Sequence, residues 1–149
     1  MAAVVTFRPA ETADEPAVNL LLCTAGLMEL DAGAQFGPQY TVAFGENSQL
    51  VGAAGVELYG NDALLRSVAV ASTTRSQGIG LALTRNRVEW CRGQRVRAIY
   101  LLTTTSAAFF ARIGFEIVAR NQAPDGIAGS HQWASACPAS STAMRLMLG

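Results

Sequence analysis

The stretch RSQGIGLALTRNRVEW, residues 75–90, constrains the fold most strongly, because it places a glycine-rich turn between a strand and a helix. The preceding residues LLRSVAV are typical of a strand, and the apolar spacing that follows predicts a helix over 78–92. The start of a helix presents backbone N–H groups and the positive end of the helix dipole, so it binds phosphate where side chains leave room. Gly78 and Gly80 leave that room, and Arg75 adds a planar, permanently charged donor.

This pattern alone does not identify the ligand. It lacks the Gly-Lys-Ser/Thr of a P-loop and the third glycine of a dinucleotide-binding fold. A glycine-rich turn beside a solvated arginine accounts for it equally well.

The remaining strands are predicted from alternating apolar residues. One strand is expected near 3–8, and YTVAFGENSQLVGAAGVELYGNDALLRSVAV predicts three antiparallel strands separated by the turns GENS and YGND. Later strands are expected in RAIYLLT, GFEIVAR and TAMRLML.

Helices are predicted between these strands. The capping-box spacing of Thr12 and Glu15 favours a helix that continues to about Leu30, and SAAFFARI favours a short one. The segment APDGIAGSHQWASACP has room for one more short helix. The resulting order β, α, β, β, β, α, β, α, β, β predicts a mixed α/β fold, with an antiparallel meander first and helix-connected strands afterwards.

Composition limits the classes of function. The chain has 149 residues, half of them apolar, which is enough to form the core of one domain over 1–149. Eleven basic and eleven acidic residues cancel, so we expect neither nucleic acid nor a membrane as a partner. Three widely spaced cysteines and a single histidine predict neither a disulfide framework nor a metal site. Without a basic leader or a long apolar span, the chain is expected to be cytoplasmic.

A family resemblance indicates which ligand the glycine-rich turn would bind. The residues LLRSVAVASTTRSQGIGLAL resemble the acetyl-CoA signature of the GNAT superfamily of N-acetyltransferases, and RAIYLLTTTSAAFFARIGFEIV is similar to the strand, helix and GF strand that follow it there. The resemblance covers 3–148 in element order and is specific in 64–118. It implies a single-domain GNAT fold, with a mixed, mostly antiparallel sheet flanked by helices, and acetyl-CoA as cosubstrate.

Two groups within the superfamily are more similar. GVELYGNDALLRSVAV, YLLTTTSAAFFARIGF and SACPASSTAM resemble the arsenic-resistance-associated N-acetyltransferases, and LTTT with FFARIGF also resembles the acetyltransferase domain of N-acetylglutamate synthases. Both imply a small amino acid, or an analogue such as arsinothricin or phosphinothricin, as the acceptor. Homodimers are common among such relatives.

The resemblance also implies which residues bind acetyl-CoA. Arg75 and the amides of Gln77, Gly78 and Gly80 would hold the pyrophosphate, and the backbone of Val68 and Val70 would pair with the pantetheine as an added strand does. Further implied cofactor contacts are Ala69, Ser76, Leu81, Thr104, Phe109 and Phe110.

Catalysis requires a base, an oxyanion donor and a proton for the leaving thiolate. We predict Glu57 as the base, with Glu29 as the alternative and His131 as a further candidate that is more often a surface residue. The backbone N–H of Val68 is the predicted oxyanion donor. Arg66 is expected to bind an acceptor carboxylate by bidentate hydrogen bonds, with a surface ion pair as the alternative, while Ser67 and Thr103 line the acceptor.

This chain departs from the family pattern at two places, and in the first of them TTT, residues 103–105, stands where the family has an asparagine at the end of the strand. Many relatives have a tyrosine that protonates the thiolate where this chain has Phe110, which cannot donate a proton. Water or Tyr59 would replace it. Cys137 is either packing or a thiol near the acceptor. An acetyl-CoA-binding module without transfer activity, and an enzyme that uses another acyl group, remain alternatives.

Overall fold

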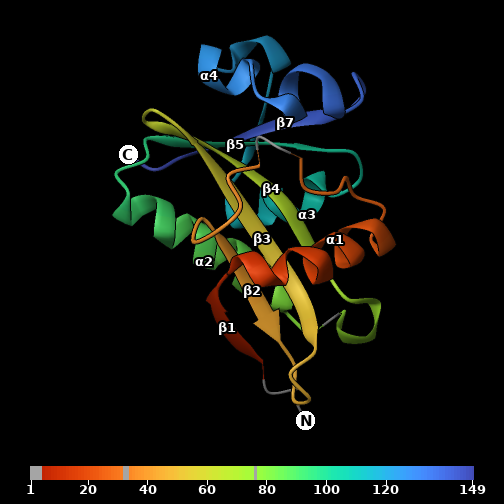
Figure 1. The fold of residues 1–149 in the computed structure, drawn as a ribbon. Helices are drawn as coiled ribbons and strands as arrows, with labels where there is room; N and C mark the ends of the chain where they lie inside the picture. The colour runs from red at the N-terminus through yellow and green to blue at the C-terminus, as the bar shows by residue number, and fades with distance from the viewer. Residues whose placement is uncertain (1–4, 32–33, 76) are drawn as a thin grey trace. The chain divides into compact units, whose positions relative to one another are not determined.

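The computed structural model describes residues 5–31, 34–75 and 77–149. Within them, seven strands form one mixed sheet in the order β1-β2-β3-β4-β5-β7-β6 (Figure 1). The strands are β1 (Thr6–Pro9), β2 (Tyr40–Phe44), β3 (Leu50–Tyr59), β4 (Asp62–Val70), β5 (Ala98–Thr103), β6 (Glu116–Val118) and β7 (Thr142–Met147). The α-helices are α1 (Glu15–Thr24), α2 (Ile79–Gly93), α3 (Ala107–Ile113) and α4 (Asp125–Ala128). Short turns of other helix types are η1 (Thr12–Asp14), η2 (Ser72–Thr74), η3 (Arg120–Gln122) and the π-helical η4 (Gln132–Ala136).

The predicted order of strands and helices is confirmed, together with the α/β fold class. The first helix is shorter than predicted, because it ends at Thr24 rather than near Leu30. Gly26 follows with a φ of 74°, a left-handed conformation that suits glycine and ends the helix. The chain then folds back, and the Leu30 N–H donates to the Asn19 side chain over 2.8 Å. The segment at 123–138 holds two helical turns rather than one, α4 and η4.

The chain divides into two compact units that share β3, β4 and α2. Unit 1 comprises 1–56 and 67–87, and unit 2 comprises 57–66 and 88–149. The single domain expected over 1–149 stays a prediction.

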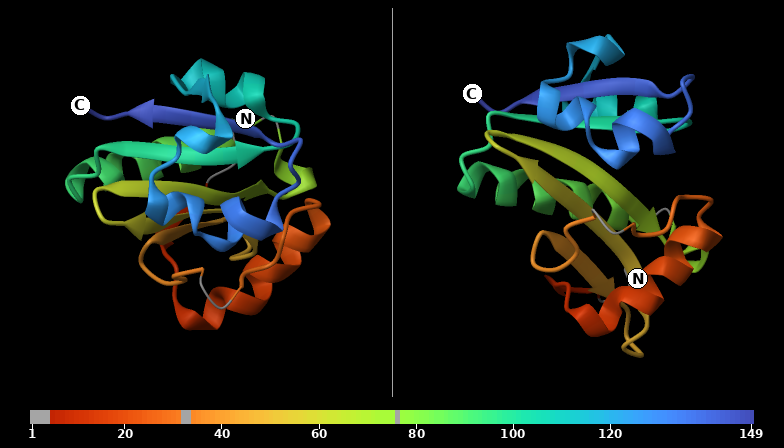
Figure 2. Two further views of the ribbon diagram at one scale, coloured as in Figure 1. Left: turned by 90° about the horizontal axis from the view of Figure 1, so that it is seen from above. Right: turned by 45° about the horizontal axis from the view of Figure 1, so that its top comes forward.

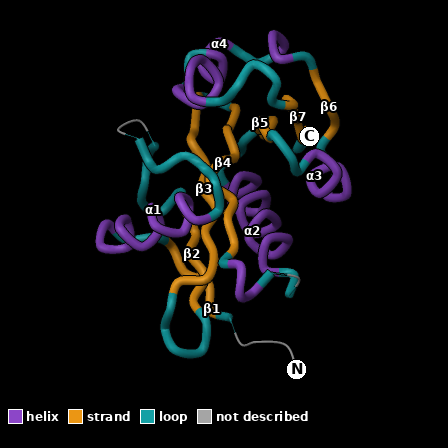
Figure 3. The backbone as a smooth tube through the Cα atoms, turned by 90° about the vertical axis from the view of Figure 1, so that its right-hand side faces the viewer, coloured by secondary structure: helices purple, strands orange, loops and turns teal. Residues whose placement is uncertain are grey.

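Unit 1 is an antiparallel sheet covered on both faces. β1 pairs with β2 and β2 with β3, both antiparallel. Val18, Leu21 and Leu22 of α1 pack on one face, against Tyr40, Val42, Ala53 and Ala69. Ile79 and Leu83 of α2 pack on the other face, against Ala43, Val51 and Ala54. Figure 3 shows α1 and α2 on opposite sides of these strands.

Unit 2 is built on β5, which pairs in parallel with the start of β4 and antiparallel with β7. β7 also pairs antiparallel with β6 and so lies between two strands that precede it in the chain. Side chains alternate across β5, so Ala98 and Tyr100 share a face on which Ile127 and Trp133 pack. These last two come from α4 and η4, beside β5 and β7 in Figure 2. No helix among the described residues has the length and apolarity needed to cross a membrane.

Candidate active site

The predicted pyrophosphate corner lies in unit 1, where β4 leads through η2 into α2. Arg75 is exposed and extended, with φ −62° and ψ 155°. Gly78 has a φ of 76°, and a Cβ placed on it would meet nothing within 4 Å. The space that the sequence reserves for a ligand is therefore open on this side of the helix start. Gln77 is exposed and Gly80 and Leu81 are partly buried, whereas Ser76 lies outside the described residues.

The position of this helix start depends on a close approach to β3. A Cβ on Gly52 would come within 2.8 Å of Leu83 Cδ1 and 3.4 Å of the Ala69 carbonyl oxygen. Glycine at this position therefore lets α2 pack directly on the strand. The buried Ile79 anchors the first turn of the helix on the same face.

The carboxyl-terminal half of β4 contains a non-glycine residue in the left-handed region. Ser67 has a φ of 60°, a conformation that costs a residue with a Cβ about 1–3 kcal/mol and occurs at functional sites. Val68 follows, half-buried, and Ala69 is buried. An interruption immediately before Val68 is the backbone geometry that the predicted oxyanion donor requires, because a regular ladder would engage its N–H.

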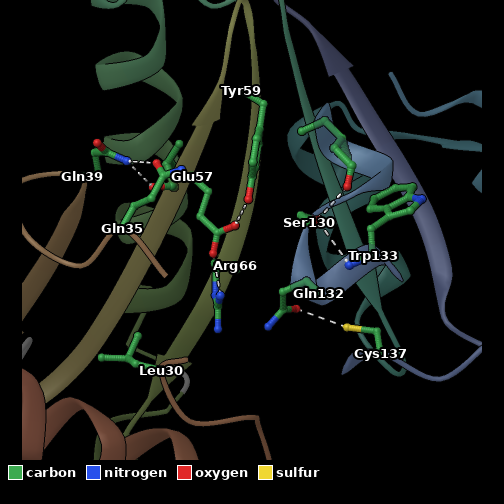
Figure 4. A network of polar contacts seen from close by, with 12 residues as sticks. Leu30, Gln35, Gln39, Glu57, Tyr59, Arg66, Ser130, Gln132, Trp133 and Cys137 are labelled. Carbon is green, nitrogen blue, oxygen red and sulfur yellow. Dashed lines mark hydrogen bonds and ion pairs between the residues drawn. The ribbon is translucent and has the colours of Figure 1, made fainter. Parts of the chain in front are cut away.

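The predicted base is buried in unit 2 with both of its oxygens engaged. Glu57 is 1% exposed, and Arg66 Nη1 donates to its Oε2 over 2.5 Å. The Tyr59 hydroxyl donates to its Oε1 (Figure 4). Glu57 is thus not a glutamate at an exposed strand edge, and Arg66 forms an ion pair whose two side chains are both 1% exposed. Loss of one partner from such a pair costs about 3–5 kcal/mol, since it leaves a buried charge uncompensated.

The other predicted acceptor and cofactor residues of unit 2 lie around α3. Thr103 Oγ1 accepts a hydrogen bond from the Ser106 N–H over 2.9 Å, so this hydroxyl supports the turn that starts the helix. Thr104 is exposed and Phe109 partly exposed. Phe110 is 7% exposed and stacks edge-on with Phe109 and Phe115, at centroid distances of 5.0 and 5.8 Å. Phe110 is therefore a core residue of unit 2.

Glu29 and His131, the alternative bases, are both exposed on the surface of the chain. Cys137 is half-buried, and its thiol donates to Gln132 Oε1 over 3.2 Å (Figure 4). Burial raises the pKa of the Cys137 thiol, while the positive charges of Arg120 and Arg66 oppose that rise. Among the residues that the structure describes, no three His, Cys, Asp or Glu side chains gather where they could hold a metal ion.

Two arginines with structural roles were missed from the sequence. Arg120 donates to the carbonyls of Trp133, Cys137 and Pro138, over 2.6, 3.3 and 2.7 Å, and so fixes the turn that carries Cys137. Arg87 reaches from α2 to the segment before β2. Each arginine donates to backbone carbonyls at least 13 positions away in the chain, and no residue type or spacing in the sequence signals such a contact.

The chain matches the acetyltransferase (GNAT) family over residues 11–115, and it belongs to this family. No curated protein matches it significantly.

Solved structures share its fold at low sequence identity. N-acetylglutamate synthase from Neisseria gonorrhoeae, complexed with coenzyme A and N-acetyl-glutamate, has a TM-score of 0.83 and 17% identity, over 100% of this chain and 36% of that one. Rv2747 from Mycobacterium tuberculosis, in complex with CoA and NLQ, has a TM-score of 0.77 and 22% identity, over 96% and 99%. The ribosomal-protein-S18-alanine N-acetyltransferase from Escherichia coli has a TM-score of 0.72 and 22% identity, over 97% and 94%. This chain spans about a third of the length of the synthase.

Proposed function

We propose that the chain acetylates the amino group of a small amino acid or amino-acid analogue by direct attack, without a covalent enzyme intermediate. The observation that carries the proposal is the buried Glu57, which is held by donors on both of its oxygens. The similar fold of a synthase complexed with N-acetyl-glutamate supports an amino-acid acceptor.

The proposed reaction needs a proton acceptor. An α-amino group is mostly protonated near neutral pH and attacks only as the free amine. The nitrogen of the free amine bonds to the thioester carbonyl carbon, and the carbon–sulfur bond breaks, so that coenzyme A leaves as its thiolate. The proton that the nitrogen gives up passes to Glu57 directly or through water, and water protonates the thiolate. Each carboxylate oxygen has two lone pairs, so the bonds from Arg66 and Tyr59 still leave Glu57 able to accept this proton.

The cofactor roles follow the geometry of unit 1. We expect Arg75 and the amides of Gln77, Gly78 and Gly80 to bind the pyrophosphate, where the open Gly78 and the charge of Arg75 coincide. Val68 and Val70 would bind the pantetheine through their backbone, with Val68 N–H facing the oxyanion. Acetyl-CoA supplies the activated acetyl group. The contacts of Thr104, Phe109 and Phe110 remain predictions from the family resemblance.

Arg66 takes a different place in this proposal from the one expected at the sequence level. It is primarily the counter-ion of Glu57, which fixes the carboxylate in position. A guanidinium has five N–H donors in a planar fork, so the same side chain can also contact an acceptor carboxylate.

The acceptor can be identified by free-thiol release from acetyl-CoA in the presence of glutamate, phosphinothricin, arsinothricin and other amino acids. Release that depends on one of the amino acids supports the proposal and identifies the acceptor. An arsenic-containing or phosphorus-containing analogue as the best substrate would connect the chain with arsenic resistance.

A second candidate is an acetyl-CoA-binding module without transfer activity. It is favoured by Phe110, which is buried among aromatic rings and has no proton to give the thiolate. Binding of acetyl-CoA in calorimetry, with no acceptor-dependent thiol release from the whole panel, would establish the module and overturn the enzyme.

A further inference from the structure

Arg87 is a buried cation on α2 whose guanidinium leaves the helix. It is 5% exposed, and Nη1 donates to the carbonyl of Gln39 over 2.8 Å and to that of Pro38 over 3.4 Å. Nε and Nη2 donate to the Asn86 side chain over 3.0 and 2.7 Å. Burial of a charge is expensive unless its donors are satisfied, so these acceptors determine where the side chain can lie. Arg87 therefore ties α2 to the two residues that precede β2.

Gln39 is in turn hydrogen-bonded to β3. Its side-chain Nε2 donates to the Val56 carbonyl over 3.0 Å and to Gln35 Oε1 over 2.6 Å, as Figure 4 shows for the two glutamines. The Val56 N–H in turn donates to the Gln39 carbonyl over 3.2 Å. The same carbonyl thus accepts from Arg87 and from Val56, and both polar groups of the Val56 backbone are bonded to Gln39.

The packing of Tyr40 against Gly55 restricts the movement of the segment before β2 relative to β3. Tyr40 is fully buried, and its ring lies so close to Gly55 that a Cβ there would come within 2.2 Å of it. Phe36 stacks on the same ring at a centroid distance of 5.0 Å. The segment from Phe36 to Tyr40 can therefore shift only together with Gly55 and Val56.

From these contacts we infer that Arg87 is a positioning residue for Glu57, the residue that follows Val56 in β3. The inference rests on the proposed function, in which Glu57 accepts the amine proton. A base works only when it is held within a few tenths of an ångström of its place. Arg87 holds the backbone of Val56 through Gln39, and with it the point from which the Glu57 side chain starts.

The inference predicts different effects on turnover and on the binding of acetyl-CoA. Arg87 lies nine residues after Gly78, which is about 13 Å along the helix axis. The predicted pyrophosphate contacts are thus at the other end of unit 1's part of α2, namely Arg75, Gln77, Gly78 and Gly80. Loss of the Arg87 contacts should impair turnover and leave acetyl-CoA affinity unchanged.

The test compares Arg87→Met with Arg87→Lys, and uses Arg85→Met as the matched control, because Arg85 is exposed on the same helix. Arg87→Met is expected to lower kcat about ten- to hundredfold, with KM and Kd for acetyl-CoA within about twofold of the unmodified chain. Arg87→Lys keeps the charge and one donor, so it should recover part of kcat. Arg85→Met should change neither constant.

Gln39→Met provides a second variant, which removes the side-chain bond to Val56 and keeps Arg87 in place. Gln39→Met should lower kcat as Arg87→Met does. If Arg87→Met does not fold, the kcat of Gln39→Met tests the inference by itself. A wild-type kcat in the folded variants, or a loss confined to acetyl-CoA affinity, overturns the inference.

Glu57→Gln, measured in the same assay, separates this inference from the function on which it rests. An unchanged kcat in Glu57→Gln overturns both. A large loss in Glu57→Gln with unchanged kcat in Arg87→Met and Gln39→Met overturns only the role of Arg87.

Discussion

At the scale of single residues, the site depends on a buried carboxylate whose two oxygens both accept hydrogen bonds. Glu57 has an arginine on one oxygen and a phenol on the other, and all three side chains belong to the hairpin formed by β3 and β4. Two of them, Glu57 and Arg66, are almost completely buried. The hairpin therefore carries the base together with the groups that hold it.

Replacing Glu57 by Gln keeps the size of the side chain and removes the proton acceptor. We expect kcat to fall about 10²- to 10⁴-fold, the range of general base catalysis, with little change in acetyl-CoA affinity. Thiol-release kinetics and calorimetry measure the two effects. Glu46→Gln is the control, because Glu46 is exposed in the turn between β2 and β3. A turnover equal to that of the control would exclude Glu57 as the base.

Cys137 provides a chemical test of its surroundings. Burial raises the pKa of its thiol, so less thiolate is present at neutral pH than in an exposed cysteine. We expect iodoacetamide to modify the exposed Cys23 first and Cys137 more slowly, with a Cys137 rate that still increases with pH above 9. Peptide mapping by mass spectrometry reads both rates. Faster labelling of Cys137 would mean that the positive charges of Arg120 and Arg66 outweigh its burial.

At the scale of elements, one ion pair joins β1 to the turn before α1. Nη1 and Nη2 of Arg8 each donate to the Asp14 carboxylate over 2.8 Å, and the Glu11 N–H donates to it over 2.7 Å. The bond to Arg8 and the backbone bond hold the pKa of Asp14 below its usual range, against the effect of burial. A carboxyl whose pKa is lowered in the folded state adds stability above its unfolded pKa and loses it as the pH falls.

Asp14→Asn should therefore destabilise the chain at neutral pH by about 1 kcal/mol. The difference from the unmodified chain should shrink as the pH falls below about 4, the pKa of an unfolded aspartate, because the pKa of Asp14 in the folded chain is lower still. Urea unfolding at pH 7 and pH 2.5 measures this difference. A difference that stays constant between the two pH values would contradict the role of the ion pair.

The order of the elements was predictable from the sequence, because strand alternation, turns and helix spacing are local patterns. The end of α1 at Thr24 was not, since the apolar residues up to Leu30 continue the helical spacing while Gly26 ends it. The place of β7 between β5 and β6 was also not predictable, because strand order depends on contacts distant in the chain.

In the site as well, features with a local sequence pattern were predictable and contacts between distant residues were not. The glycine-rich helix start is a local signal, and Gly78 is open as that signal requires. The pairing of Glu57 with Arg66 crosses a hairpin and was missed, although a two-residue turn at Gly60 and Asn61 would place the two side chains on one face of the sheet. The contacts of Arg87 with backbone carbonyls have no such signal.

At the scale of the whole molecule, the balance of charges allows the contact between Arg75 and acetyl-CoA to be detected by its dependence on salt. Basic and acidic residues number eleven each, so the chain as a whole has no net field to attract the anionic acetyl-CoA. Any strong dependence of binding on salt must then arise from a local contact. Arg75 is the exposed cation beside the open helix start and the predicted source of that dependence.

Arg75→Ala should weaken acetyl-CoA binding about tenfold at low ionic strength, as the loss of one charge-assisted hydrogen bond to phosphate does. The loss should be smaller at 0.5 M salt, because the Debye length falls well below 10 Å and the charge is screened in the unmodified chain as well. Calorimetry at both salt concentrations measures this, with the exposed Arg85→Ala on the same helix as control. Equal affinities of the two variants would place the pyrophosphate elsewhere. A loss that is the same at both salt concentrations would mean that Arg75 shapes the turn rather than contacting the phosphates.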